Sequence, residues 1–126
     1  MDPLALLKRS AGQTAEDAAA RELRRHGCEI IARNARSKLG ELDLIVRDGD
    51  YIAFVEVRSR RDGSPVAPRE TLTAAKQQRL RRLAESYLRE HKWVGRRWRI
   101  DVVEVATDAA GKAGEMTWLK AAVSGR

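Results

Sequence analysis

Residues 40–60, GELDLIVRDGDYIAFVEVRSR, constrain the fold of this chain more than any other segment. The segment contains two apolar runs, about 41–47 and 50–58, that are separated by Asp48-Gly49. An Asp-Gly pair between alternating apolar runs is among the strongest short-range signals for a β-hairpin. The sequence therefore predicts two antiparallel strands here, and the acidic residues inside these strands need an explanation.

The predicted hairpin register gathers the acids on one side. Side chains alternate between the two faces of a strand, and a two-residue turn would pair Arg47 with Asp50. In that register Glu41 lies opposite Glu56, and Asp43 is a diagonal neighbour of Glu56 at about 7–8 Å. The opposite face is then left to the apolar residues Leu42, Leu44, Val46, Val55 and Val57.

Clustered carboxylates on a partly apolar face repel one another and lose hydration, so their pKa values should rise unless a positive charge lies among them. A divalent cation such as Mg²⁺ would supply that charge, because Mg²⁺ prefers oxygen ligands and commonly combines carboxylates with a substrate phosphate. An equally simple interpretation is that Glu41 and Glu56 form ordinary ion pairs with Arg58 or Arg33. The residues alone leave both interpretations open.

The rest of the chain predicts one domain with the element order α-β-β-β-α-β-β. A capping box at Thr14 begins an alanine-rich helix to Arg25, and a leucine stripe indicates a second helix over about 71–91. Three further strands are expected at 28–33, 97–105 and 116–119, with a polar link at 34–38 and a basic loop at 59–69. We expect a domain at 14–120 between a loose arm, 1–13, and a tail, 121–126, with helices flanking a mixed sheet.

The composition and net charge of the chain indicate which binding partners and which cellular compartment to expect. The 126 residues carry a net charge of +7 with a pI near 10.2 and include a single cysteine. One cysteine excludes an internal disulfide, and no apolar run is long enough to span a membrane. The N-terminal segment has an acid at position 2 and no small-residue cleavage site, so we expect no signal peptide and a cytoplasmic protein. The positive charge favours a polyanion such as nucleic acid, although a solvated basic surface without a specific partner is the alternative.

The order of the motifs resembles a known family. Asp43, followed by Glu56-Val57-Arg58 on the next strand, resembles the PD-(D/E)XK nuclease signature. More closely, the chain resembles the YraN family of predicted endonuclease-like proteins, which are similar to archaeal Holliday-junction resolvases. The resemblance covers about residues 14–105 and includes Glu16, Asn34, Arg36, residues 40–45, residues 54–58, Arg60, Lys76-Gln77 and Asp101-Val102-Val103.

This resemblance implies a restriction-endonuclease-like three-layer fold and Mg²⁺- or Mn²⁺-dependent hydrolysis of DNA. Asp43 and Glu56 would be metal ligands, with the Val57 carbonyl and Glu16 as further oxygen donors. Lys76 and Arg58 would stabilise charge, with Glu41 and Gln77 in support. The resemblance is also compatible with a homodimer, because resolvase-like enzymes act on two strands.

Two of these residues have simpler interpretations. Glu16 would also suit the start of a helix, where the dipole favours an acid, and Lys76 would also suit the edge of a core-facing stripe. Arg58 departs from the family signature, whose last residue is usually lysine, and an arginine cannot act as a general base. A non-catalytic nucleic-acid-binding module and a protein-interaction scaffold are therefore the alternative functions. Residues expected to grip phosphates are Arg36, Arg60, Arg61, Arg69, Arg79 and Arg82.

Overall fold

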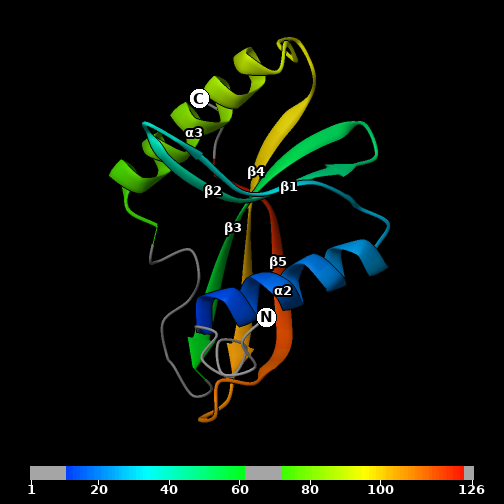
Figure 1. Cartoon of the computed structure of the whole chain (residues 1–126), viewed down its shortest axis with the longest axis vertical. Coiled ribbons are helices and arrows are strands. Elements are labelled where there is room, and N and C mark those ends of the chain that lie inside the picture. The colour runs from blue at the N-terminus through cyan, green and yellow to red at the C-terminus, as the bar shows by residue number, and fades with distance from the viewer. Residues whose placement is uncertain (1–10, 62–71, 124–126) are drawn as a thin grey trace, which may run out of the picture.

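The computed structural model describes residues 11–61 and 72–123, with side chains from Thr14 onward, as a mixed α/β fold (Figure 1). Its elements are α2 (Ala11–Arg25), β1 (Glu29–Ser37), β2 (Gly40–Asp48), β3 (Tyr51–Arg61), α3 (Ala74–Glu90), β4 (Trp98–Thr107) and β5 (Ala113–Val123). The predicted order α-β-β-β-α-β-β is confirmed. The predicted arm, the C-terminal tail and most of the basic loop, including Arg69, lie largely outside the described residues.

The five strands form one sheet in the order of the sequence, β1-β2-β3-β4-β5. The pairs β1–β2, β2–β3 and β4–β5 are antiparallel, whereas β3 and β4 are parallel. Parallel neighbours need a crossover connection, and here that connection contains α3. The sheet is therefore mixed, as the sequence predicts.

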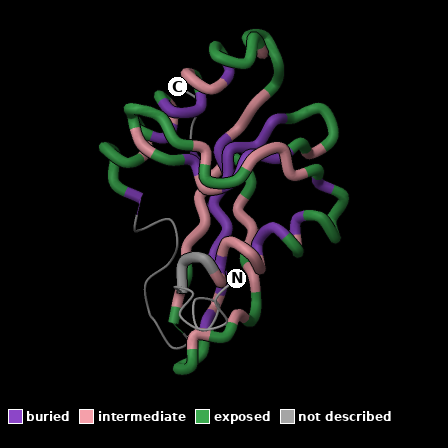
Figure 2. The backbone as a smooth tube through the Cα atoms, in the orientation of Figure 1, coloured by how far each residue is buried: buried purple, intermediate pink, exposed green. Residues whose placement is uncertain are grey.

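The two helices cover opposite faces of the sheet and give three layers. Along β3, Ile52 and Phe54 belong to a core cluster with the leucines of α3, while Ala53 and Val55 belong to a second cluster with α2. This alternation follows from the two-residue period of a strand. Figure 2 shows the buried residues concentrated along the strands between the helices.

Helix α3 matches its prediction closely. Its buried residues Leu80, Leu83, Ala84 and Leu88 are the predicted stripe, and the Thr73 side chain accepts a hydrogen bond from the Lys76 N–H at the N-cap. Helix α2 begins at Ala11, so the predicted capping box at Thr14 is wrong. Its buried face consists of the small residues Ala15, Ala19 and Ala20 with Leu23, which lets the helix lie close to the sheet.

All five strands extend beyond a predicted end, and β1, β3 and β5 do so by three residues or more. β1 continues to Ser37, so most of the predicted polar link is strand, and β3 continues to Arg61. β5 spans Ala113–Val123 rather than four residues. β1 and β5 are the two edges of the sheet.

The hairpin register differs from the prediction by two residues. Asp48 pairs with Tyr51 and Arg47 pairs with Ile52, so the turn consists of Gly49 and Asp50. Gly49 has φ +59° and takes the first turn position, which type II′ hairpin turns reserve for glycine. A shift of two residues keeps the paired side chains, as far as Leu44 and Val55, on their predicted faces.

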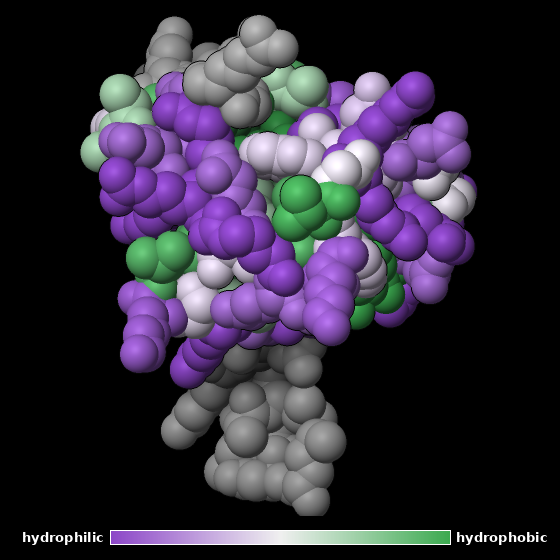
Figure 3. Space-filling model, turned by 90° about the horizontal axis from the view of Figure 1, so that it is seen from above, coloured by the Kyte–Doolittle hydropathy of each residue, from purple (hydrophilic) through white to green (hydrophobic). Residues whose placement is uncertain are grey.

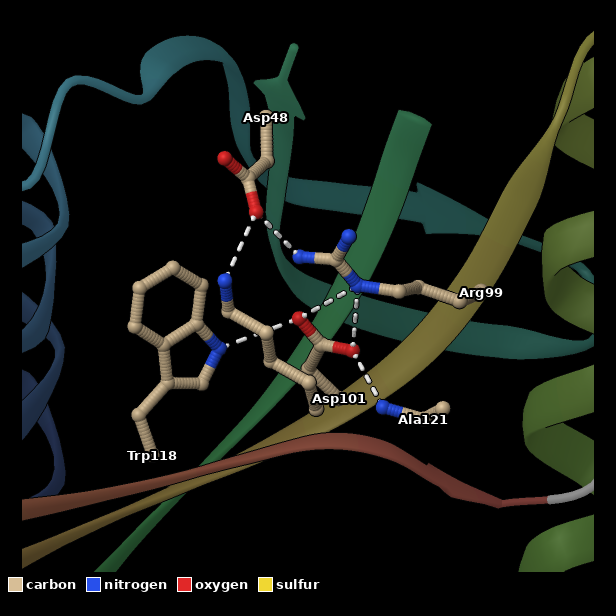
Figure 4. A network of polar contacts seen from close by, with 6 residues as sticks. Asp48, Arg99, Asp101, Trp118 and Ala121 are labelled. Carbon is tan, nitrogen blue, oxygen red and sulfur yellow. Dashed lines mark hydrogen bonds and ion pairs between the residues drawn. The ribbon is translucent and has the colours of Figure 1, made fainter. Parts of the chain in front are cut away.

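A buried polar network fastens the turn end of this hairpin to β4 and β5 (Figure 4). The Asp101 carboxylate, fully buried, accepts hydrogen bonds from Arg99 Nε, Trp118 Nε1 and the Ala121 N–H at 2.8–3.1 Å. Arg99 also bonds Asp48 at 2.6 Å.

Neither helix in the described part of the chain has the length and apolarity that a bilayer crossing requires.

Candidate functional site

The sheet forks where β2 leaves β3. The last β2–β3 pair is Leu44 with Val55, whereas β2 stays paired with β1 as far as Gly40 and β3 stays paired with β4 as far as Arg61. At the fork, the Val57 N–H donates a 2.8 Å hydrogen bond to Asp43 Oδ2. The carboxylate of Asp43 therefore satisfies a backbone donor that would otherwise pair with a neighbouring strand.

The fork also changes which way β2 faces. Leu44 and Val46 pack in the α2 cluster as neighbours in a regular strand should, but Leu42 packs in the α3 cluster. The prediction that Leu42 shares a face with Leu44 is therefore wrong. The period of two breaks at Asp43, because β2 turns away with β1 at this point and lies against α3.

Carboxylates from both layers converge at the fork. Oxygen atoms of Glu16 on α2 and of Glu41 and Asp43 on β2 all lie within 4.8 Å of one another. Glu56 on β3 joins them, because its carboxyl group hydrogen-bonds with that of Asp43. We call these four residues, Glu16, Glu41, Asp43 and Glu56, the acid cluster.

Burial and mutual repulsion raise the pKa values within the acid cluster. Burial first, and then the charge of Asp43, raise the pKa of Glu56 from 4.5 to about 7, against the opposing effects of Arg58 and Lys76. Burial and Asp43 likewise raise the pKa of Glu16 to about 7. The pKa of Asp43 is also raised, mainly by burial, although the Val57 N–H acts in the opposite direction. The cluster thus contains more negative charge than its surroundings stabilise.

Asn34 lies beside the acid cluster, and sequence reasoning predicted no role for it. With its amide nitrogen facing the acids, Asn34 donates to Glu16 Oε1 at 3.0 Å and to Glu41 Oε1 at 2.8 Å. Its φ of +51° lies in the left-handed region, which asparagine tolerates better than most residues. A polar residue able to adopt this conformation, in a strand opposite the acids, is the signal that could have identified it.

The predicted cationic partners of the cluster lie beside it. The positive charges of Arg58 and Lys76 both lower the pKa of Glu56, so both side chains are near its carboxylate. Lys76 is in the first turn of α3. Gln77 instead donates to the Leu72 carbonyl at 3.0 Å, which ties the start of α3 to the segment before it.

The ion-pair alternative accounts for only part of the cluster. Arg33 pairs with Asp17 rather than with the acids of the hairpin, and Glu41 pairs with Arg36 at 3.2 Å. The alternative for Glu16 as a helix-start acid does not apply, because α2 begins five residues earlier and the dipole effect is confined to the first turn. In the structure the Val57 N–H contacts Asp43, and metal ligation by the Val57 carbonyl stays a prediction.

The predicted phosphate-gripping arginines that the structure describes lie on three elements: Arg36 on β1, Arg60 and Arg61 on β3, and Arg79 and Arg82 on α3. Arg36, Arg61, Arg79 and Arg82 are exposed, whereas Arg60 pairs with the buried Glu104 at 3.3 Å. Seen from above, the end that carries α3 is covered mainly by hydrophilic side chains (Figure 3).

The acid cluster fits a hard divalent cation on its donor chemistry. Its ligand atoms are carboxylate oxygens, which Mg²⁺ and Mn²⁺ prefer, and three of them already lie within 4.8 Å of one another. A cation would also offset the repulsion that raises the pKa values of Glu16 and Glu56.

Comparisons with known proteins agree on one family. Residues 15–105 match the model of "Uncharacterised protein family UPF0102". A UPF0102 protein of Pelotomaculum thermopropionicum is 46% identical over 101 residues, covering 80% of this chain and 84% of its own. One of Chloroflexus aurantiacus is 53% identical over 97 residues, covering 76% and 78%. On this match over most of its length, the chain belongs to the UPF0102 family, also called the YraN family.

Proposed function

We propose that this protein is a metal-dependent endonuclease that hydrolyses phosphodiester bonds in DNA, with structure-specific cleavage of the kind seen in Holliday-junction resolvases. One observation carries the proposal: acids from α2, β2 and β3 converge where the central sheet forks, and the pKa values of Glu16 and Glu56 rise to about 7. Partly buried carboxylates with raised pKa values beside a basic surface are typical of a functional site rather than of a structural ion pair.

The fold supports the same conclusion. The order α-β-β-β-α-β, with β3 and β4 parallel and a helix on each face, matches the restriction-endonuclease-like core that the sequence motifs imply. In the proposed site, Asp43 and Glu56 hold Mg²⁺ or Mn²⁺, and Glu16 contributes a further oxygen. Such a cation lowers the pKa of a bound water and stabilises negative charge on a phosphate.

The chain's own residues then have separate tasks. Asn34 fixes Glu16 and Glu41, and the Val57 N–H fixes Asp43, so the acids keep their positions when substrate arrives. Lys76 and Arg58 place positive charge beside Glu56, where the charge on a scissile phosphate would build up. Arg58 stays protonated at any ordinary pH, so its task is to stabilise charge and not to remove a proton.

A cleavage assay tests the proposal. Wild type should nick or cut branched, single-stranded or duplex DNA in Mg²⁺ or Mn²⁺ and should be inactive in EDTA. Asp43→Asn should lose about 10²-fold or more of that activity, in the range reported for loss of one charge-stabilising group. Glu85→Gln is the matched control, because Glu85 is an exposed acid of α3 and its loss changes the net charge equally. Equal cleavage by wild type and Asp43→Asn would refute the proposal.

A second candidate, a non-catalytic nucleic-acid-binding protein, is favoured by one feature. Arg58 stands where related nucleases usually carry lysine, and an arginine there cannot share in proton transfer. This candidate predicts salt-dependent DNA binding with no cleavage in any metal. If both cleavage and salt-dependent binding are absent, neither function holds.

A further inference from the structure

A pocket with a cavity volume of about 140 Å³ lies between the β1–β2 hairpin and α3, apart from the acid cluster. Leu42, Leu83 and Ala35 form apolar parts of its wall, and Tyr87 and His91 contribute aromatic rings. Ser37, Ser86, Glu90 and Arg36 supply the polar groups. The pocket thus combines apolar walls with groups that can form hydrogen bonds.

The volume of the pocket limits the size of the ligand that it can hold. Its volume is close to that of an engineered cavity of about 150 Å³ that binds benzene, so it suits a single six-membered ring. The rings of Tyr87 and His91 stack with centroids 3.9 Å apart, which gives the wall an aromatic block. The serine hydroxyls and the Glu90 carboxylate offer hydrogen bonds to a polar ring rather than to a hydrocarbon.

Two residues connect the pocket with the acid cluster. Arg36 lines the pocket and also pairs with Glu41 of the cluster at 3.2 Å. Leu42 lines the pocket from its place in the strand between Glu41 and Asp43. Because β1 is an edge strand, a nucleic-acid strand could pass around this edge, with Arg36 beside its phosphates.

We propose that this pocket receives one unstacked pyrimidine base of a nucleic-acid strand whose neighbouring phosphate lies at the acid cluster. The proposal rests on the proposed function for the identity of the strand, and it adds the base class and the position at which the strand is held. Unstacked bases exist in single strands and at branches, and they bind on aromatic side chains through their ring faces. The pocket would therefore favour branched or single-stranded substrates over intact duplex.

Binding in EDTA tests this inference without any cleavage. Short labelled oligothymidylate, oligoadenylate and an abasic strand of the same length are compared by fluorescence anisotropy with the full chain. Wild type should bind oligothymidylate about five-fold or more tightly than either of the others, the lower end of what one base–aromatic contact contributes. Ser86→Leu, which fills the pocket, should abolish that preference and leave salt-dependent binding to the abasic strand intact.

Gln78→Leu is the matched control, because Gln78 is an exposed neutral residue of α3 that does not line the pocket. Ala35→Leu fills the pocket from β1 and should repeat the effect of Ser86→Leu, which guards against a folding defect in either variant. The inference would be overturned if wild type did not prefer oligothymidylate. It would also be overturned if this preference remained in both Ser86→Leu and Ala35→Leu. Tighter competition by free thymidine monophosphate than by the strand would also overturn it. A failed cleavage assay with this preference intact would instead contradict only the proposed hydrolysis.

Discussion

The Val57 N–H donates a 2.8 Å hydrogen bond to Asp43 Oδ2 at the point where β2 and β3 separate. One side-chain oxygen of Asp43 therefore has a structural task, while burial and the charge of Glu41 raise the pKa of the same carboxylate. Under the proposed function Asp43 would also hold the cation, and substitutions can separate this role from the structural one.

Asp43→Asn should be more stable than Asp43→Ala in the absence of metal. Asparagine keeps an oxygen that can accept from Val57 and removes the charge that repels Glu16 and Glu56. Alanine leaves the partly buried N–H without its acceptor, at a cost of about 1–3 kcal/mol. Urea unfolding of both variants in EDTA measures the difference. A lower free energy of unfolding for Asp43→Asn than for Asp43→Ala would contradict this role of the hydrogen bond.

The free energy of unfolding should fall as pH rises from about 4.5 to about 7 in EDTA. Glu16 and Glu56 have folded-state pKa values of about 7 against an ordinary 4.5, so the folded state binds more protons than the unfolded state in that window. The stabilisation by these protons is complete below the window and is lost above it. Thermal unfolding across this range measures the effect.

Glu56→Gln should flatten this pH dependence, and Glu85→Gln should leave it unchanged. Because Glu56 is partly buried and interacts with Asp43, we expect a gain of roughly 1–2 kcal/mol for Glu56→Gln at pH 8. Saturating Mg²⁺ should make the free energy of unfolding of wild type less dependent on pH, because a bound cation favours ionised acids. A slope that Glu56→Gln does not alter would contradict the assigned environment of this residue.

Asn34→Gly and Asn34→Ala should separate conformation from hydrogen bonding. Both variants lose the amide that bonds Glu16 and Glu41, so both should bind Mn²⁺ more weakly, by about 10-fold as for other residues that orient ligands. Only alanine is strained at φ +51°, so Asn34→Ala should also lose about 1 kcal/mol of stability relative to Asn34→Gly. Titration and urea unfolding measure the two effects. Unchanged Mn²⁺ affinity in both variants would show that Asn34 does not position the acids.

Asp101→Ala should lower the free energy of unfolding by about 3–5 kcal/mol. The substitution leaves Arg99, whose side chain is only 13% exposed, without its buried partner, and it removes the acceptor for Trp118 and Ala121. Lys120→Met removes an exposed ion pair with Asp48 and should cost about 1 kcal/mol or less. Comparable losses in the two variants would mean that the buried network is not what fastens the hairpin.

Local patterns predicted the elements of the fold well. The leucine stripe of α3 and the alternation in residues 40–60 are local signals, because each depends on spacing within one element. The element order followed from them. The hairpin register was missed by two residues, because the choice between Asp48-Gly49 and Gly49-Asp50 as the turn depends on the backbone twist that each turn imposes.

The candidate site was only partly predictable for a different reason. Asp43 and Glu56 could be placed together from the hairpin alone, and the motifs added Glu16. The fork could not be foreseen, since it arises from β2 following β1 while β3 follows β4. Consequently the packing of Leu42 against α3, the contact between Val57 and Asp43, and the part played by Asn34 all required the structure.

The account depends most on the acid cluster being a cation site, and Mn²⁺ binding followed by electron paramagnetic resonance tests this directly. Wild type should bind Mn²⁺ at pH 7.5, and Mg²⁺ should displace the bound Mn²⁺. Asp43→Asn should bind Mn²⁺ at least about 10-fold more weakly than wild type. Glu85→Gln, with the same change in net charge, should bind as wild type does. Equal Mn²⁺ affinity in wild type, Asp43→Asn and Glu85→Gln would contradict the central claim.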